Sequence, residues 1–424
     1  SRARLVFFSL VLSVAWGPGR AQSPDDPVID LRAAMAVALQ RSGALKASAA
    51  NARAASEDAV AAAQRPDPVL RLSLDNLPVN GPDRWSTTRD FMTMRSIGVM
   101  QTLPSQRKRQ VRAQRFEREA DAARLQRLMQ AADVQQQTAV AWFELHAAQQ
   151  RLALLGAQRD EAQRQVLAAE AAARAGRGSQ TAWIEAREAV GRLEQMGIQI
   201  EAEQRDAQRT LERWTGQPAA RPVGTPPPLA PPPVPADALL HQHPALRAMQ
   251  ARTDVARAAA EVASAERDPD WSVELMLSKR GSAYSDMVSV GVSIPLVGNR
   301  AQRQDRELAA RLAEVDALDA ELDEARRARA QDIAAWREAL SAALAQRELI
   351  DRERVPLAAQ RTEAALAAYR AGAAPLASVL SAREASLALA LERVDVELRA
   401  ARQWAALDAL QPMDPATPVE PAAR

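Results

Sequence analysis

The sequence predicts a mostly α-helical protein with a small β part, and three observations support this class. The chain is rich in alanine, arginine, glutamate and leucine, while aromatic residues make up only 4% of its 424 residues, which is typical of long helices and coiled coils. Residues 105–217 contain no proline. Short segments elsewhere alternate apolar and polar residues, which is typical of β-strands.

The absence of cysteine excludes several classes of site. The chain contains no Cys, so it has no disulfide framework, no thiolate zinc site, no iron–sulfur cluster and no cysteine nucleophile. Any chemistry must come from other side chains.

The first residues resemble a secretory signal peptide. Arg2 and Arg4 precede the apolar run 5–16, and the small-residue pattern Gly19-Arg20-Ala21 follows, so we predict a signal peptide over residues 1–21. An ordinary buried segment is the alternative. Removal of residues 1–21 removes three arginines and no acid, which changes the formal net charge from +2 to −1.

The chain contains an internal duplication. Residues 42–47 (SGALKA) align with residues 243–248 (HPALRA), and later pairs follow in the same order: Ala141-Trp142 with Ala335-Trp336, Arg174-Ala175-Gly176 with Arg370-Ala371-Gly372, and Ala186-Arg187-Glu188 with Ala382-Arg383-Glu384. Each repeat is predicted as helix, strand, loop, strand, very long helix, break and long helix. We therefore divide the chain into a first repeat (22–215), an extended Pro-rich linker (216–235), a second repeat (236–410) and a disordered tail (411–424).

The helices after the strands are predicted to form long hairpins. Only the segment Gly176-Arg177-Gly178-Ser179 interrupts residues 105–217, and apolar residues recur at coiled-coil spacing on both sides of it. A helix of about 60–70 residues is about 90–105 Å long. Such a hairpin is longer than a globular domain needs.

The strands carry apolar residues on one face only. The predicted lipid-facing residues are Leu70, Leu72, Leu74, Val288, Val290, Val292 and Ile294. This alternation is typical of a transmembrane barrel strand. Four strands cannot close a barrel, which needs about eight, so we expect three copies to close a 12-stranded β-barrel as a trimer. The alternative is two hairpins packed on a helix in a soluble domain.

The order of loops and helices predicts an orientation. An exported chain inserted in an outer membrane would place the loops at 75–90 and 278–286 outside and its helices in the periplasm. We expect such a hollow helical bundle to act as a conduit.

The duplicated layout resembles the TolC-like family of outer-membrane efflux factors over residues 30–410. The matching pieces include His243-Pro244-Ala245-Leu246, Val355-Pro356 and Tyr369-Arg370-Ala371-Gly372. The resemblance implies a homotrimer in outer-membrane lipid, with a 12-stranded β-barrel over an α-barrel. It also implies two partners: a periplasmic adaptor (membrane fusion) protein and an inner-membrane pump of the resistance-nodulation-division type.

Two segments resemble the heavy-metal branch of that family. Residues 103–107 (LPSQR) are similar to its Leu-Pro-Gly-Lys-Arg turn, and residues 294–300 (IPLVGNR) to its Pro-Leu-Phe-Asp-Arg-Asn segment, with several departures. The resemblance implies export of cobalt, zinc, cadmium, copper or silver cations.

The hairpin turns correspond to the periplasmic aperture of the family. The residues assigned to this tip are Arg174, Gly176, Arg177, Gly178, Tyr369, Arg370 and Gly372. The acidic residues that often gate the family's aperture are missing just beyond both turns. Arg177 would instead form a ring of three positive charges if it faced inward, or would contact the adaptor if it faced outward.

Other candidate sites are weaker. His241 and His243 could bind a metal but lack a third ligand, and His146 lies among helical residues. A basic run at 106–109, with Arg112 and Arg115, could contact nucleic acid, but it has no interleaved aromatics. No nucleophile–base pair is recognisable. We therefore expect a channel without cofactor, bound metal, catalysis or nucleic-acid partner; the alternative is a periplasmic coiled-coil adaptor or scaffold protein that does not enter the membrane.

Overall fold

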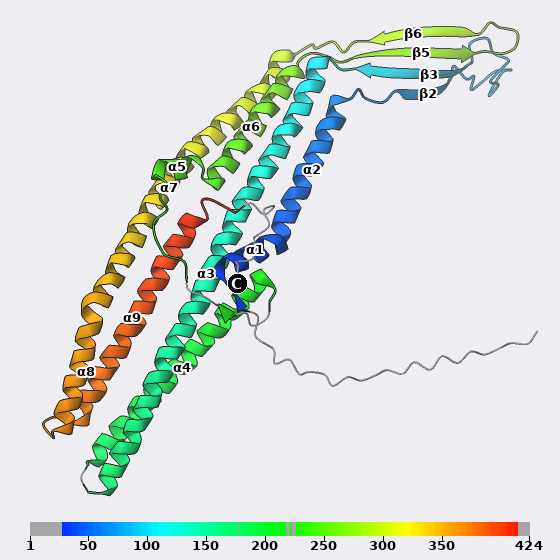
Figure 1. The fold of residues 1–424 in the computed structure, drawn as a ribbon. Coiled ribbons are helices and arrows are strands. Elements are labelled where there is room, and N and C mark those ends of the chain that lie inside the picture. Colours follow the sequence, from blue (N-terminus) through cyan, green and yellow to red (C-terminus); the bar gives the residue numbers. More distant parts are fainter. Residues whose placement is uncertain (1–27, 177, 218–220, 223–225, 414–424) are drawn as a thin grey trace, which may run out of the picture.

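The protein is an elongated bundle of long helices with a small sheet at one end (Figure 1). The computed structural model describes residues 28–176, 178–217, 221–222 and 226–413. The predicted signal peptide, Arg177, parts of the linker and the tail from residue 414 lie outside the described residues.

The first half contains three strands, two shorter helices and a long helical hairpin. In chain order these are β1 (Val28–Ile29), α1 (Leu31–Arg41), α2 (Gly43–Ala63), β2 (Val69–Asp75), β3 (Met94–Leu103), α3 (Gln106–Arg174) and α4 (Gln180–Thr215).

The second half follows the same plan with an interrupted long helix. Its elements are β4 (Arg221–Pro222), α5 (Ala236–His241), α6 (Pro244–Ala265), β5 (Trp271–Lys279), β6 (Met287–Ser293), the 3₁₀ turn η1 (Arg300–Gln302), α7 (Gln304–Leu349), the π-helical turn η2 (Ile350–Arg354), α8 (Val355–Arg370) and α9 (Leu376–Asp408). The predicted fold class, mostly α with a small β part, is confirmed.

Local sequence signals set the ends of the helices. The Ser105 hydroxyl accepts from the Lys108 backbone N–H at 3.2 Å and caps α3, and Ser179 caps α4 in the same way through the Ala182 N–H. Gly216 ends α4 in the left-handed conformation, with φ of 70°, which glycine adopts without the steric penalty of a Cβ. With 69 residues, α3 is about 104 Å long.

A π-helical turn replaces regular α-helix in the second half. Helix α7 passes through η2 directly into α8, which carries Pro356 near its start. Proline has no N–H to donate to the preceding turn, and a π-turn redistributes the hydrogen bonds around such a position. The homologous stretch of α3 has no proline and is one continuous helix.

The main sheet has four antiparallel strands in the order β2-β3-β5-β6. Its central pair, β3 and β5, joins the two halves of the chain. The sheet extends away from the helix ends, and the turns of both helical hairpins lie at the opposite end of the molecule (Figure 1).

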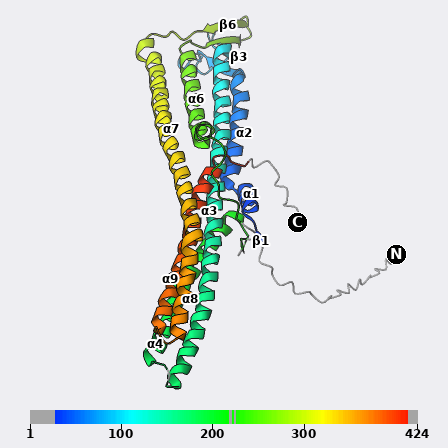
Figure 2. The same cartoon turned by 60° about the vertical axis from the view of Figure 1, so that its left-hand side comes forward.

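The largest apolar core lies midway along the bundle, where helices from both halves meet. Trp142, Leu145, Leu211, Leu340 and Trp404 are buried there, and the rings of Phe143 and Trp404 pack edge to face at 5.9 Å. Figure 2 shows α1 and the C-terminal end of α9 beside α3 at this level. Near the C-terminal end of α9, the Met413 backbone N–H donates to Gln135 Oε1 at 3.0 Å, so Met413 contacts α3.

Candidate functional site

One face of the four-stranded sheet is apolar and exposed. Every predicted lipid-facing residue is exposed: Leu70, Leu72 and Leu74 on β2, Val288, Val290 and Val292 on β6, and Ile294 one residue past the end of β6. Leu72 and Val290 each expose 72% of their surface. Water does not normally face so much aliphatic surface in one patch, so this face requires an apolar environment.

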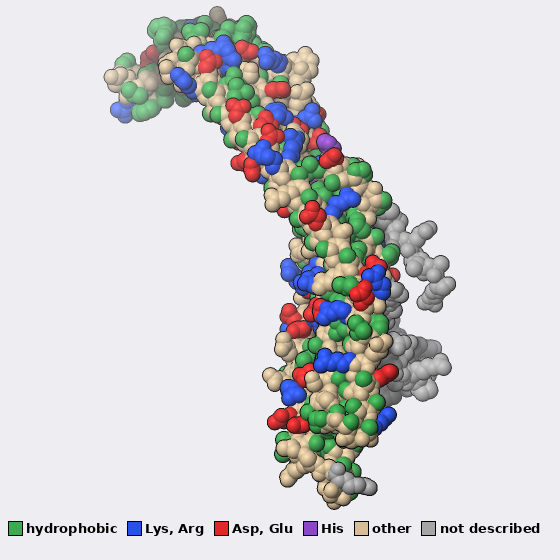
Figure 3. All heavy atoms as spheres, turned by 90° about the vertical axis from the view of Figure 1, so that its left-hand side faces the viewer, with side chains coloured by type: hydrophobic (Ala, Val, Ile, Leu, Met, Phe, Trp, Pro, Cys, Tyr) green, Lys and Arg blue, Asp and Glu red, His purple; other side chains and the backbone are tan. Residues whose placement is uncertain are grey.

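The strand register makes this apolar face continuous. Leu72 pairs with Ile97, Ile97 with Leu277, and Leu277 with Val288, so one row crosses all four strands. A second row runs parallel to it: Leu70, Val99, Leu275 and Val290. Figure 3 shows hydrophobic side chains gathered over the sheet, whereas charged side chains of both signs are interspersed along the helices.

The opposite face of the sheet is polar and hydrogen-bonded. Arg71 Nη1 is 2.9 Å from Glu274 Oε1, and the Ser96 and Ser278 hydroxyls are 2.8 Å apart. The Asp75 carboxylate accepts from the Ser73 hydroxyl at 2.9 Å. This sheet therefore separates an apolar side from a polar side.

Both edges of this sheet are open. Strands β2 and β6 each pair with one neighbour among the described residues, so the outer backbone groups of each lack a ladder partner. Unpaired strand edges readily accept another chain, and they are not tolerated in a lipid environment. The sheet can therefore accept a further strand at each edge.

A charged cluster ties the sheet to the helices. Lys108 in the first turn of α3 is only 2% exposed, and its Nζ lies 2.7 Å from Asp270 Oδ1 and 3.3 Å from Glu266 Oε2. The guanidinium of Arg112 also binds Glu266. Lys108 and Arg112 belong to the basic run of the sequence, so two of its cations are used within the chain, between α3 and the segment that joins α6 to β5.

The two predicted tips lie together at the far end of the helices. Gly176 and Gly372 have φ of 67° and 71°, a conformation that favours glycine. Arg174 forms an ion pair with Glu170 at 2.5 Å, and Tyr369 is 37% exposed. Arg370 and Gly178 are exposed, while Arg177 lies outside the described residues. The turns thus present small and exposed polar residues.

A narrow groove lies above the tips between the first hairpin and α9. It encloses about 190 Å³ and is lined by Leu193 and Met196 of α4 and by Leu380, Leu387 and Leu391 of α9. Arg383 of α9 is paired with Glu161 of α3 at 2.6 Å. These contacts hold α9 to the first hairpin.

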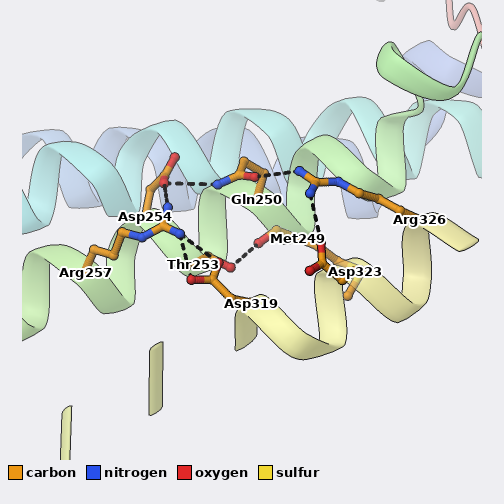
Figure 4. A network of polar contacts seen from close by, with 8 residues as sticks. All are labelled: Met249, Gln250, Thr253, Asp254, Arg257, Asp319, Asp323 and Arg326. Atoms are coloured by element: carbon orange, nitrogen blue, oxygen red, sulfur yellow. Dashed lines mark hydrogen bonds and ion pairs between the residues drawn. The ribbon is translucent and has the colours of Figure 1, made fainter. Parts of the chain in front are cut away.

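Polar contacts also hold α6 to α7 on the way to the sheet (Figure 4). Arg257 Nη2 of α6 lies 2.7 Å from Asp319 Oδ1 of α7, and Arg326 of α7 donates to Gln250 of α6 at 3.2 Å. The hydrogen bond to Asp319 raises the pKa of Arg257 above its usual value. This network of mostly exposed side chains fixes the two helices side by side.

The histidines do not form a metal site. Among the described residues, no group of three or more His, Asp or Glu side chains could hold a metal ion. His146 stacks on Trp142, His241 is exposed, and His243 is buried at the start of α6. Within the same described part of the chain, no helix is long and apolar enough to cross a bilayer.

Several of these features are missed by sequence reasoning. The acids that meet Lys108 lie far along the chain, with Asp270 at a separation of 162 positions, so no local pattern indicates the pair. The parallel contact between β1 and β4 involves two residues on each side, which is too short to show a periodicity. The proline at position 356 is the sequence feature that could have indicated the π-helical turn η2.

The fold matches that of solved outer-membrane channels. The chain aligns with the outer-membrane channel OprN (19% identity, TM-score 0.76, 90% of each chain). It aligns equally well with CusC, whose structures describe folding and transmembrane channel formation (16% identity, TM-score 0.77, 90% of this chain and 92% of that one).

A third neighbour is the outer membrane protein VceC from Vibrio cholerae (19% identity, TM-score 0.74, 90% of this chain and 95% of that one). No family model matches the sequence, and no curated protein matches it. The structural matches confirm, at the level of the fold, the resemblance to TolC-like channels.

Proposed function

We propose that this chain is one subunit of a trimeric outer-membrane channel. In this proposal, the channel is a passive export duct from the periplasm to the exterior. The observation that carries the proposal is the sheet, which has one continuous apolar face, one polar face and two open edges.

Closure of the sheet requires more than one copy, and the resemblance to TolC-like channels implies three. Three copies supply twelve strands, enough to close a barrel with a polar interior. The outer edge of β6 in one copy then pairs with the outer edge of β2 in the next. Every strand edge is satisfied, the apolar rows face lipid, and the polar pair Arg71–Glu274 faces the lumen.

The helices extend the duct through the periplasm. Helix α3, at about 104 Å, carries the hairpin turns far from the sheet. In the proposed orientation the loops between strands lie outside the cell, and residues 1–21 direct export. The tip residues Arg174, Gly176, Arg177, Gly178, Tyr369, Arg370 and Gly372 then face a periplasmic adaptor and a pump of the resistance-nodulation-division type.

Heavy-metal cations are the proposed substrates. This part rests on the resemblance of residues 103–107 and 294–300 to the heavy-metal branch. Deletion of the gene, followed by growth on a panel of metals, dyes and antibiotics, tests it. Sensitivity to cobalt, zinc, cadmium, copper or silver is expected, and unchanged metal tolerance would count against it.

Substitutions on the two faces of β6 test the channel itself. Val290→Arg places a charge near the middle of the apolar face, where the cost is about 2–4 kcal/mol in a bilayer, so trimers should be lost from outer membranes. Ser289→Arg is the matched control, because Ser289 pairs with Met276 on the polar face and an arginine there would face the lumen.

The readout is a heat-modifiable trimer in detergent-solubilised outer membranes. The proposal requires the wild-type protein and Ser289→Arg to form it, and Val290→Arg to fail. Equal tolerance of both substitutions, with a soluble monomer of native mass, would favour a periplasmic scaffold protein instead.

A further inference from the structure

Two basic residues face each other at the outer end of the apolar face. Arg95 at the start of β3 pairs directly with Lys279 at the end of β5. They lie two positions from Ile97 and Leu277, so their side chains emerge on the same face as the apolar rows. This pair therefore ends the apolar face on the side away from the helices.

The pair has no acidic partner. Neither cation forms an ion pair with another described residue, and the Arg95 guanidinium donates only to the Arg280 carbonyl, at 3.2 Å. Like charges directly opposite each other on a sheet destabilise it. On the polar face the chain avoids this problem, since Arg71 is paired with Glu274.

Three of the four acids near this end interact with other groups, and the fourth forms no ion pair with the two cations. Asp75 accepts from the Ser73 and Ser96 hydroxyls on the polar face. Asp90 accepts from the backbone N–H groups of Met92 and Thr93. Asp83 lies 3.6 Å from Arg89. The remaining acid, Asp286, is exposed just before β6 and forms no ion pair with either cation of the described pair.

Exposed aromatic residues lie in the two loops that connect the strands at this end of the sheet. Trp85 and Phe91 in the loop between β2 and β3 are 60% and 55% exposed, and Tyr284 in the loop between β5 and β6 is 39% exposed. The Arg280 guanidinium lies over the Tyr284 ring at 5.6 Å. Amphipathic rings of this kind concentrate at the level of lipid headgroups.

The spacing along β5 matches one hydrophobic layer. Trp271, 53% exposed, begins the strand on the same face, and Lys279 ends it. At about 3.3 Å per residue the two are about 26 Å apart along the strand. The tilt of about 35–45° of barrel strands reduces this to about 20 Å of height, which covers most of the roughly 25 Å apolar band of a membrane barrel. Arg95 and Lys279 thus lie at the outer headgroup level.

We propose that Arg95 and Lys279 together bind the phosphate group of an anionic lipid in the outer leaflet. The inference rests on the proposed membrane insertion. A phosphate between the two side chains would accept charge-assisted hydrogen bonds from both and would relieve their repulsion. The lipid then acts as the missing anion of this ladder position and fixes the height of the sheet in the membrane.

Native mass spectrometry of the detergent-solubilised trimer, titrated with diphosphorylated lipid A, tests the proposal. The double variant Arg95→Gln/Lys279→Gln should bind the lipid about 30-fold more weakly, which is about 2 kcal/mol at 1.4 kcal/mol per factor of ten. The control Lys46→Gln/Arg53→Gln removes the same two charges from the exposed surface of α2 and should bind like the wild type. Equal binding by all three proteins would overturn the inference.

A charge reversal separates lipid binding from sheet stability. Lys279→Glu puts opposite charges across the ladder, so the trimer should resist heat at least as well as the wild type in detergent, while lipid A binding falls. Unchanged lipid binding by this variant would also overturn the inference. If millimolar inorganic phosphate displaced lipid A from the trimer and the site showed no preference for the lipid, the two residues would form a simple anion site. That result would contradict the inference.

A separate measurement tests the proposed function. Assembly of the wild-type trimer in outer membranes is measured before any lipid is added. Absence of that trimer contradicts the channel, whereas a normal trimer with unselective lipid binding contradicts only the role of Arg95 and Lys279.

Discussion

His243 links the stability of α6 to pH. Its side chain is 7% exposed, and Nδ1 accepts the Ala245 backbone N–H at 3.2 Å as the cap of the helix. Burial, followed by the charge of Arg329, lowers its pKa below the usual value, against a smaller opposing effect of Asp332. Protonation would also turn Nδ1 into a donor and remove the cap.

The lowered pKa predicts loss of stability in acid. The unfolded chain takes up the proton at a pH near 6.5, before the folded chain does. The stabilisation is therefore complete above about pH 6.5 and decreases as the pH falls below it. Urea unfolding midpoints between pH 5 and 8 should decrease on the acid side.

Substitution of His243 tests this assignment. His243→Asn keeps a capping side chain but cannot titrate, so its midpoint should depend less on pH. Some dependence remains, because burial also lowers the pKa of His146. The exposed His241→Asn variant is the control; if it flattens the profile equally, His243 is not responsible.

A second prediction at this scale concerns Lys108. Lys108→Met leaves Glu266 and Asp270 facing only Arg112, and we expect a loss of about 2 kcal/mol in unfolding free energy. This is less than the roughly 3–5 kcal/mol for fully buried pairs, because the side chains of Glu266 and Asp270 remain 36% and 26% exposed.

The residue before Lys108 on α3 provides a comparison. Arg107 is exposed and forms no ion pair with another described residue, so Arg107→Met should change the unfolding free energy by less than about 0.5 kcal/mol. A similar loss in both variants, measured by urea unfolding, would mean that the buried position of Lys108 has no special role.

At the scale of the elements, the hairpin turns require glycine, whereas the interiors of the helices do not. Gly372 has φ of 71°, so Gly372→Ala should destabilise the turn by about 1 kcal/mol. Gly156 lies within α3, and the space that a Cβ would occupy there is open, so Gly156→Ala should stabilise its helix by about 0.5–1 kcal/mol.

Hydrogen exchange can resolve these opposite effects. Amides flanking Gly372 should exchange about fivefold faster in Gly372→Ala, while amides near Gly156 should exchange more slowly in Gly156→Ala. A change of the same sign at both positions would show that backbone conformation does not control the turn.

Most elements could be predicted because their signals are local. Alternation located the strands to within a few residues, and the glycines at 176 and 372 located both turns. The structure adds what depends on distant partners. Met196 is one of the apolar residues at coiled-coil spacing along α4, yet it is 38% exposed, because heptad spacing alone does not say which flank of the apolar stripe faces a neighbouring helix.

The residues of the candidate site could be predicted only where their sequence signals are local. The apolar face follows from alternation within each strand, so its residues on β2 and β6 were visible in the sequence. The pairing of Arg95 with Lys279 was not, since it depends on the register between strands from different halves of the chain.

At the scale of the whole molecule, the chain has two parts with different surfaces. The helical part has interspersed charges of both signs, and the sheet has an exposed apolar face (Figure 3). Ion pairs between exposed side chains contribute little individually, so the helical part depends mainly on its central core around Trp142 and Trp404. In the proposed trimer, the sheet instead depends on completion by other copies.

The central ladder of the sheet also determines the order of folding. Ser96 and Ser278 are in contact across β3 and β5 although 182 positions separate them. The β2–β3 hairpin can close by local contacts, but the β3–β5 ladder cannot form until α3, α4, α6 and β5 have all been synthesised. Pairings this distant form slowly, and the waiting β3 edge is open to wrong partners. The nascent chain therefore needs protection of that edge until β5 arrives, and early packing of α6 against α3, which places β5 next to β3, would shorten that time.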